Sequence, residues 1–585
     1  MASMSLNAAT GLSGMLKEGT RYFSSEGDAM NASVTLRNIE ACLELGKMLS
    51  TSLGPQGRAK LVVNHLGRLN VTSDCASILK EIEIEHPAAQ LLKQACQKQE
   101  TECGDNTNFV VALAGELLWQ TALLIQKMTW QNAPELLMGY QRSLQLLTEE
   151  YLPSLVVKDE ELQLTDLTQK SQLVKLLLPI LASKQYGTED ILAPLVADAC
   201  LQVMTRSPTD GKKLEFHADA VRIVKILGSS VQHSSIILGF VAQRGVETTL
   251  TQVTNGAKIA VYASGIEASS TEAKGTVLMK TAEDLKAYNK TEESKMQEII
   301  DGIAASGVNV VVTGGNVSDM ALHFLNRNKL LCVKLGSKWE LRRLCQAVNA
   351  TALVRLGAPT PDEMGHCDSV MTKQVGGRLV TVFSHANADA AKGTKLATIL
   401  LRASTLSVLN DLERAVDDGV QAVAQAVTNS NSKQGCQLVY GGGAVEMACS
   451  VLLMREAGKV PGLEQYSMEA FAKALQVIPR TLAENAGWDT TRVLADLQAA
   501  HATSQNEALA SGKAIAVCDS GIDIERDDSD DFSKKSGGVT SMKDKGVVDL
   551  LSTKVSALKL AVDATITILK IDQIIMSKQS GGPKV

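Results

Sequence analysis

The sequence predicts a multidomain α+β protein, and three observations lead to that class. The chain has 585 residues, more than one hydrophobic core usually serves, so we expect two or three domains. Both ends carry long helical patterns, whereas the middle alternates short apolar runs with helical patterns, as in an α/β domain. Gly- and Asp-rich motifs occur near both ends and are missing from the middle. If these motifs build one site, the chain folds back on itself and the middle is an insertion.

Composition excludes several classes of function. A net charge of -6 and a pI near 5.9 give no electrostatic footprint for a nucleic acid, and aromatic residues make up only 3%. The 11 cysteines contain no C-x-x-C pair, so neither a zinc site nor a disulfide framework is indicated. We expect no secretory signal and no apolar stretch of membrane-spanning length. The composition therefore favours a soluble intracellular protein with reduced thiols, no nucleic acid and no membrane.

The first 150 residues are predicted to be mostly helical, and residues 153–218 to be a mixed region that contains helices. Residues 32–53 have apolar positions near helical spacing, and the helix must stop at Gly54-Pro55 because proline cannot continue it. The segment after that loop predicts a β-hairpin with its turn near Leu66-Gly67. Further helical patterns cover 76–101, 107–128, 133–150, 171–181 and 188–205.

The middle of the chain is predicted to alternate strands with helices, and the end to combine helices, a loop and a strand. Buried strands are predicted at 258–264, 308–315 and 329–335, with helices at 291–305, 317–327 and 337–348. The charged segment 271–295 is either a solvated surface excursion or a protruding functional arm. A returning strand is expected at 376–387, helices from about 397 to 510, an acidic loop at 523–538, a lone alternating strand at 564–575 and a disordered tail after it.

Five motifs could each contribute to a binding or catalytic site, or could have a purely structural role. GDNTN precedes a helix start, which suits phosphate, and Asp105 there could hold a magnesium ion or act only as an N-cap. SLGPQG could be a plain helix stop, and Asp74 a plain cap. Asp418 follows Arg414 by four residues, so a helix-surface ion pair is the ordinary reading. GGGAVE could be a tight turn or a close backbone approach to a nucleotide. The Walker A pattern is absent from the sequence.

Taken in order, the motifs SLGPQGRAK, SDCAS, GDNTN, ERAVDDG and GGGAVE resemble those of the group II chaperonins. The resemblance runs over essentially the whole chain and implies a chaperonin subunit of three domains. A mostly helical equatorial domain would comprise 1–152 and 411–585. A small α/β intermediate domain would comprise 153–218 and 374–410. The α/β apical domain, 219–373, would carry a helical protrusion at about 271–295 that forms a lid.

The resemblance also implies roles for individual residues. Asp105 would hold magnesium, and Asp74 and Asp418 would position and activate the attacking water. The positions implied to contact the nucleotide are Leu53, Gly54, Pro55, Asn106, Thr107, Asn108, Phe109, Ser183, Lys184, Gly442, Gly443 and Asp549. The family pattern is not matched throughout, because Asn106 and Asn108 replace a glycine and a threonine, and Ser73 and Cys75 replace an asparagine and a glycine.

The implied function is that of an ATP-dependent molecular chaperone in the cytoplasm, with ATP and Mg²⁺ as cofactors. Its partners would be seven paralogous subunits in a hetero-oligomeric double ring, and its clients actin and tubulin. Lys338, Arg342 and Arg343 would contact substrate, or would lie on an ordinary amphipathic surface helix. Two alternatives stay open: a ring scaffold that binds nucleotide with little or no hydrolysis, and a self-assembling archaeal-type chaperonin.

Overall fold

The computed structural model describes residues 22–23, 34–64, 67, 69–127, 133–159, 162–164, 166–206, 213–254, 256–267, 281–384, 396–431, 435–512, 515–525, 538–571 and 574–575. The chain forms two compact units. The first unit comprises Met1–Thr165, Ala182–Tyr186 and Cys436–Val585, and the second comprises Asp166–Leu181 and Gly187–Gly435. Both ends of the chain therefore belong to one unit, as the split motifs predict. The division into three domains stays a prediction.

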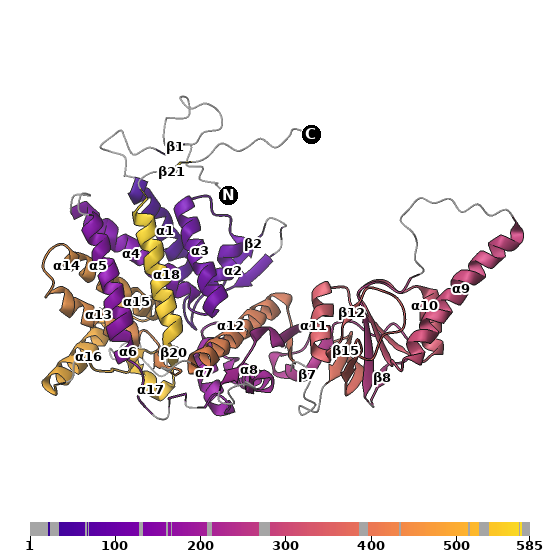
Figure 1. Ribbon diagram of the computed structural model, residues 1–585. Helices are drawn as coiled ribbons and strands as arrows, with labels where there is room; N and C mark the ends of the chain where they lie inside the picture. Colours follow the sequence, from indigo (N-terminus) through magenta and orange to yellow (C-terminus); the bar gives the residue numbers. More distant parts are fainter. Residues whose placement is uncertain are drawn as a thin grey trace. The chain divides into compact units, whose positions relative to one another are not determined.

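The first unit is built around a bundle of long helices. α1 (Val34–Ser50), α3 (Pro87–Cys103), α4 (Thr107–Lys127) and α18 (Leu551–Leu569) lie side by side and share one apolar core (Figure 1). By length and composition α4 could cross a membrane, but 61% of its 107–125 window is buried inside the protein. A core helix of a globular unit has these properties, so α4 is the centre of this fold.

Further elements complete the first unit (Figure 1). The helices are α2 (Cys75–Glu81), α5 (Ala133–Leu146), η2 (Leu147–Tyr151), α6 (Leu152–Ser154), α13 (Ala444–Ala457), α14 (Glu464–Leu475), α15 (Val477–Asn485), α16 (Thr490–Ala510) and α17 (Met542–Lys545). Four antiparallel strand pairs complete the unit: β1 (Tyr22–Phe23) with β21 (Ile574–Ile575), β2 (Lys60–Val63) with β3 (Leu69–Thr72), β17 (Leu438–Tyr440) with β20 (Val548–Leu550), and β18 (Ser520–Ile522) with β19 (Val539–Ser541).

The second unit contains two larger sheets. Parallel strands in the order β11 (Leu331–Lys334), β10 (Val310–Thr313), β9 (Ala257–Tyr262) and β12 (Ala352–Leu353) form one sheet, and β13 (Gly365–Cys367) pairs antiparallel with β9. The other sheet has the order β6 (Val221–Leu227), β16 (Ala397–Ala403), β7 (Ser235–Ala242), β15 (Arg378–Ser384), β14 (Ser369–Val375) and β8 (Gln252–Val253). β4 (Thr205–Arg206) pairs with β5 (Leu214–Glu215).

Helices of the second unit follow the predicted alternation. They are α7 (Lys170–Ala182), α8 (Glu189–Val203), η3 (Ala218–Ala220), η4 (Val231–His233), α9 (Ala282–Ala305), α10 (Asp319–Arg327), α11 (Lys338–Val348) and α12 (Leu406–Ser430). The parallel strands β9, β10 and β11 are almost wholly buried, which explains why their sequences are mostly apolar. The prediction of an α/β region here is confirmed.

Three sequence predictions of local structure are wrong. The predicted helix 76–101 is two helices, because Pro87 begins α3 and the residue before a proline avoids helical geometry. Residues 397–403 form strand β16 before the helix begins at Leu406. Most of the predicted strand 564–575 belongs to α18, and only Ile574–Ile575 is a strand.

The α18 error has a clear physical cause. Ala564, Thr565, Ile566, Ile568 and Leu569 are all buried, so the helix is apolar on most of its circumference. Such a segment loses its 3.6-residue period, and its Thr and Ile residues then imitate a strand. The predicted arm 271–295 is described only from residue 281, and α9 begins at Ala282. Most of the acidic loop 523–538 and the tail lie outside the described residues.

Candidate functional site

The SLGPQG loop is held in place by side chains from two other helices. Asn108 donates from Nδ2 to the backbone oxygen of Ser52 at 3.1 Å, and Asn485 donates to the backbone oxygen of Leu53 at 2.8 Å. Gly54 has φ +81°, and a Cβ there would lie 2.5 Å from Cδ2 of Leu482. The positive φ favours glycine at this position, and a larger residue would also require the Leu482 side chain to move. The loop lies beside the start of α4.

The start of α4 presents an acidic residue at a helix N-terminus. Gly104 ends α3 in the left-handed conformation, and Asn106 also has a positive φ of 64°. Asparagine tolerates that region better than most residues, so its substitution for glycine preserves this backbone turn. Gln99 donates to the backbone oxygen of Asp105 at 2.9 Å and anchors the turn on α3. The Asp105 side chain is half-buried at the junction of the two helices.

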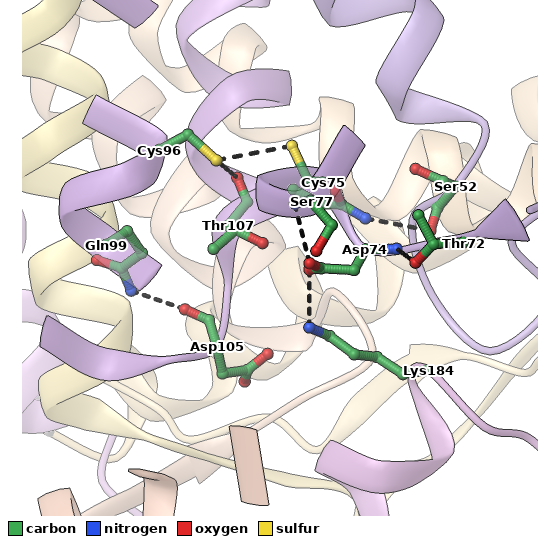
Figure 2. A network of polar contacts seen from close by, with 11 residues as sticks. Ser52, Thr72, Asp74, Cys75, Ser77, Cys96, Gln99, Asp105, Thr107 and Lys184 are labelled. Carbon is green, nitrogen blue, oxygen red and sulfur yellow. Dashed lines mark hydrogen bonds and ion pairs between the residues drawn. The ribbon is translucent and has the colours of Figure 1, made fainter. Parts of the chain in front are cut away.

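Asp74 forms an ion pair with Lys184 from a distant part of the chain. Nζ of Lys184 lies 2.9 Å from Oδ1 of Asp74, while Ser77 donates its backbone N–H to Oδ2 at 3.0 Å (Figure 2). Only 3% of the Asp74 side chain is exposed. Burial opposes ionisation, but the charge of Lys184 and the Ser77 hydrogen bond outweigh it and lower the pKa of Asp74 to about 2.

Asp105 has the opposite electrostatic environment. Burial and the negative charge of Asp549 raise the pKa of its carboxyl, against smaller effects of Lys184, the Asn106 backbone and Lys554. In Figure 2 the Asp105 side chain lies on the Lys184 side of the polar network. Asp549 is paired with Lys554 at 3.2 Å, whereas Asp105 has no ion pair of its own among the described residues, so a further positive charge near Asp105 would be favourable.

The Gly-rich turn comes from the C-terminal part of the chain. Gly442 has φ +62°, and a Cβ there would lie 2.4 Å from Sδ of Met542. Ile522 donates its backbone N–H to the backbone oxygen of Gly442 at 2.9 Å. Gly443 begins the turn into α13, and Asp549 lies on β20, which pairs with β17 directly before the turn. The turn is closely packed, because Gly442 is half-buried and Gly443 is buried.

Sequence reasoning missed a buried lysine. Nζ of Lys554 lies 2.7 Å from Glu446 and 3.2 Å from Asp549, and its side chain is only 7% exposed. Burial lowers the pKa of Lys554, but the charges of Asp549 and Glu446 outweigh it and raise the value above the ordinary range. Lys554 also lies 4.9 Å from the ring centroid of Phe109, which is buried in the core. Glu446 was visible as the last letter of GGGAVE, whereas nothing in the sequence marked Lys554.

The remaining predicted residues lie in different surroundings. Leu53, Pro55 and Ser183 are half-buried in the first unit, and Thr107 is buried at the start of α4. Asp418 is buried on α12 of the second unit. Lys338, Arg342 and Arg343 are exposed on α11, whose Leu341, Leu344, Ala347 and Val348 are buried. Within the first unit, therefore, the structure brings Asp74, Asp105, Lys184 and Asp549 into one electrostatic neighbourhood.

The oxygen atoms of this neighbourhood suit a magnesium ion. Oδ1 of Asn108 is buried and has no hydrogen-bond partner among the described residues. Together with the Asp105 carboxylate it supplies the hard oxygen donors that Mg²⁺ prefers, directly or through its bound waters. A divalent cation would also offset the repulsion between Asp105 and Asp549. Within the described residues no cluster of three or more His, Cys, Asp or Glu side chains forms a metal cage.

Comparisons with known proteins agree with these observations. Residues 45–579 match the model of the TCP-1/cpn60 chaperonin family. The chain is 41% identical to T-complex protein 1 subunit theta of Homo sapiens over 576 residues, which cover 98% of this chain and 96% of the relative. It is 38% identical to the subunit of that name in Dictyostelium discoideum, over 98% of each chain. A probable theta subunit of Schizosaccharomyces pombe is 39% identical, over 97% of this chain and 96% of the relative.

Proposed function

Because the chain belongs to the TCP-1/cpn60 chaperonin family, we propose that it is a ring subunit that binds and hydrolyses ATP to drive the folding of enclosed proteins. The Lys184–Asp74 ion pair beside Asp105 carries this proposal. It joins one acidic motif residue, Asp74, to a lysine 110 positions away, and the charge of that lysine also acts on Asp105. A purely structural cap at Asp74 would not require that partner.

Asp105 would hold the magnesium ion, with Asn108 on the same side of the helix start. Bound magnesium neutralises charge on the phosphates during transfer to water. The N-terminus of α4 adds unpaired backbone N–H groups, which favour an anion. Gly54, Gly442 and Gly443 are proposed as places where the nucleotide meets backbone, and Leu53, Pro55, Asn106, Thr107, Phe109, Ser183 and Asp549 are proposed as its other contacts.

Asp74 and Asp418 are proposed to orient the attacking water. Asp74, with its pKa near 2, is a weak proton acceptor while Lys184 is bound to it. Its first task is thus alignment of the water. If Lys184 turns to the terminal phosphate, the buried Asp74 loses a counter-charge and becomes more basic. Lys184 would in this way link the presence of phosphate to the activation of water.

The larger assembly follows from the same family. We propose a hetero-oligomeric double ring with seven paralogous subunits, located in the cytoplasm, with actin and tubulin as clients. The equatorial domain would be 1–152 and 411–585, the intermediate domain 153–218 and 374–410, and the apical domain 219–373. The segment 271–295 would form the lid, and Lys338, Arg342 and Arg343 would contact clients through the exposed face of α11.

The test is to replace Asp418 by alanine and by asparagine in the assembled ring. Both variants should bind ATP with Mg²⁺ as the unaltered protein does, while phosphate release from this subunit falls about 10²- to 10⁴-fold. Asp496→Ala, an exposed position on α16, is the matched control and should change neither quantity. The other subunits must carry inactivating substitutions so that only this one is measured. Undiminished phosphate release from the Asp418 variants would overturn the assignment.

A second candidate is a scaffold subunit that binds nucleotide without turnover. The departures from the family pattern at Asn106 and Ser73 favour it, because each stands next to one of the acidic residues of the site. The retained left-handed turn at Asn106 and the three aspartates favour hydrolysis. In the same ring, tight binding of ATP by the unaltered subunit with no measurable phosphate release would select the scaffold. Rings formed by the purified chain alone would instead indicate a self-assembling chaperonin.

A further inference from the structure

Gln99, on α3, is a fully buried amide engaged at both ends. The residue is 0% exposed. Its Nε2 donates to the backbone oxygen of Asp105 at 2.9 Å and to that of Thr553 at 3.4 Å. Its Oε1 accepts from the hydroxyl of Ser556 at 3.0 Å. Burial of an amide is tolerated when its donor and acceptor groups are paired in this way.

These three contacts fix the orientation of the Gln99 amide. A carbonyl oxygen can only accept, so the NH₂ group has to face the backbone oxygens of Asp105 and Thr553. A flipped amide would bring its own oxygen against both of them. In Figure 2 the Gln99 nitrogen points at the Asp105 backbone. The side chain therefore connects the turn that carries Asp105 to the N-terminal part of α18.

The turn at Asp105 needs such a connection. Gly104 and Asn106, on either side of Asp105, both have a left-handed backbone, with φ 76° and 64°. That conformation costs free energy for a residue other than glycine, and it persists where surrounding contacts hold it. Gln99 holds this turn twice, because its backbone oxygen also accepts the N–H of Gly104 at 3.2 Å.

The α18 end of the connection is itself firmly held. Lys554 lies on the same part of α18 and pairs with Glu446 at 2.7 Å and with Asp549 at 3.2 Å. Its side chain is buried, so solvent screens these ion pairs little. This part of α18 is thus a fixed support, and Gln99 ties the Asp105 backbone to it.

We propose that Gln99 is a positioning residue for magnesium, because it holds Asp105 where the carboxylate can bind the ion. This inference rests on the proposed function, in which Asp105 holds Mg²⁺ together with ATP. Mg²⁺ demands near-ideal octahedral geometry, so a displaced carboxylate binds it less well even though its charge is unchanged. Residues that orient a metal ligand without touching the metal commonly change metal affinity about 10- to 100-fold when they are replaced.

A role in packing alone makes a different prediction. If Gln99 only joined α3 to α18, its loss would weaken the fold and would affect ATP binding equally with and without metal. As a positioning residue it acts through Asp105, so its loss leaves the binding of metal-free ATP unchanged. The quantity that separates the two roles is the gain in ATP affinity on adding Mg²⁺.

The test measures the affinity of the full-length chain for ATP in saturating Mg²⁺ and in EDTA, by isothermal titration calorimetry. Mg²⁺ should raise the affinity of the unaltered chain, because it supplies positive charge beside Asp105. Gln99→Met keeps a side chain of similar size and removes the hydrogen bonds of the amide. In this variant the gain should fall at least about tenfold, while the affinity in EDTA stays that of the unaltered chain. An undiminished gain would overturn the inference.

Gln505→Met is the matched control. Gln505 is also buried, and its amide exchanges hydrogen bonds with the backbone of Ala516 at 2.8 Å and 3.1 Å. The same substitution therefore removes comparable contacts in the same unit and leaves those of Asp105 intact. Its gain from Mg²⁺ should equal that of the unaltered chain. An equal reduction of the gain in the two variants would show that lost packing is responsible, and the inference would be wrong.

Ser556→Ala decides the question if Gln99→Met does not fold. This variant removes only the contact to Oε1, from a half-buried side chain. The amide then loses one anchor on α18, so the gain from Mg²⁺ should fall by a smaller factor, with the affinity in EDTA unchanged. The absence of any reduction would then refute the inference. If the unaltered chain itself gained nothing from Mg²⁺, the proposed role of Asp105 would fail, so the chain in which the failure occurs distinguishes the two.

Discussion

The regions around Asp74 and Asp105 treat a carboxylate in opposite ways, although both lie at helix starts of the same unit. Asp74 is paired with Lys184 and has a pKa of about 2. Asp105 lies near Asp549 and has a raised pKa. The protein itself supplies a counter-charge for the Asp74 carboxylate. It supplies too little positive charge for the Asp105 carboxylate. A site built for a metal–phosphate ligand has this property, because its counter-charge arrives with the ligand.

Among the lysines near these carboxylates, removal of Lys554 should lower the stability of the fold most. Lys554→Met would leave Glu446 and Asp549 without their shared partner in a buried position. Removing one member of a buried pair typically costs about 3–5 kcal/mol, so the free energy of unfolding should fall by that amount. Denaturant unfolding of the full-length chain measures it.

Lys459→Met is the matched control for this prediction. Lys459 pairs with Glu456 at 2.8 Å, but 57% of its side chain is exposed. An exposed pair contributes at most about 1 kcal/mol. If the two variants lost the same stability, the Lys554 ion pairs would contribute no more than an exposed pair. The prediction that Lys554 compensates two buried carboxylates would then be wrong.

The sequence predicted the participants of this region better than their arrangement. GDNTN, SLGPQG and GGGAVE located the helix start and the two loops, because glycine and proline mark backbone geometry directly. Lys184 was assigned only through the family resemblance, and its pairing with Asp74 depends on a long-range contact that no local pattern encodes. Lys554 was missed for the same reason. It lies in an apolar stretch that resembles any core helix.

The fold shows the same limit. α1, α4 and α11 were predicted from helical patterns and the strands β9, β10 and β11 from short apolar runs, whereas the end of α18 was mistaken for a strand. An element surrounded by others loses the contrast between faces on which the prediction depends. The split motifs alone predicted that the two chain ends share one unit. The chemical roles of the aspartates came only from the family resemblance, because composition assigned no role to any of them.

Lys184→Met should remove the feature that sets Asp74 apart. The lowered pKa of Asp74 corresponds to about 2 kcal/mol of stability. That contribution is present above the unfolded-state pKa near 4 and is lost as pH falls toward about 2. The variant should be less stable by about this amount at pH 7 and should lack the loss of stability in that acidic window.

Lys98→Met provides the control, because Lys98 pairs with Glu102 on an exposed helix surface. Its stability should follow the pH profile of the unaltered chain, within about 0.5 kcal/mol. Superimposable profiles for Lys184→Met and the unaltered chain would show that the ion pair with Asp74 does not contribute to folding.

Asp105→Asn should change stability least among these variants, and it should raise stability where the others lower it. The folded-state pKa of Asp105 is raised, so its charge costs stability above the unfolded-state pKa, and the cost disappears as pH falls through the folded-state pKa. The ligand-free variant should therefore unfold at a slightly higher temperature at pH 7, and the difference should shrink on acidification. Asp74→Asn should instead lower the unfolding temperature.

The response of the Asp105→Asn variant to ligand completes the test of the comparison. A neutral amide in place of the Asp105 carboxylate would hold Mg²⁺ poorly, because the ion prefers charged oxygen donors. The further stabilisation by ATP with Mg²⁺ should therefore be lost in this variant, as thermal unfolding with and without the ligand would measure. A ligand-free Asp105→Asn chain as destabilised as Asp74→Asn would mean that the two carboxylates are equally satisfied by the protein, and the contrast between the two regions would not hold.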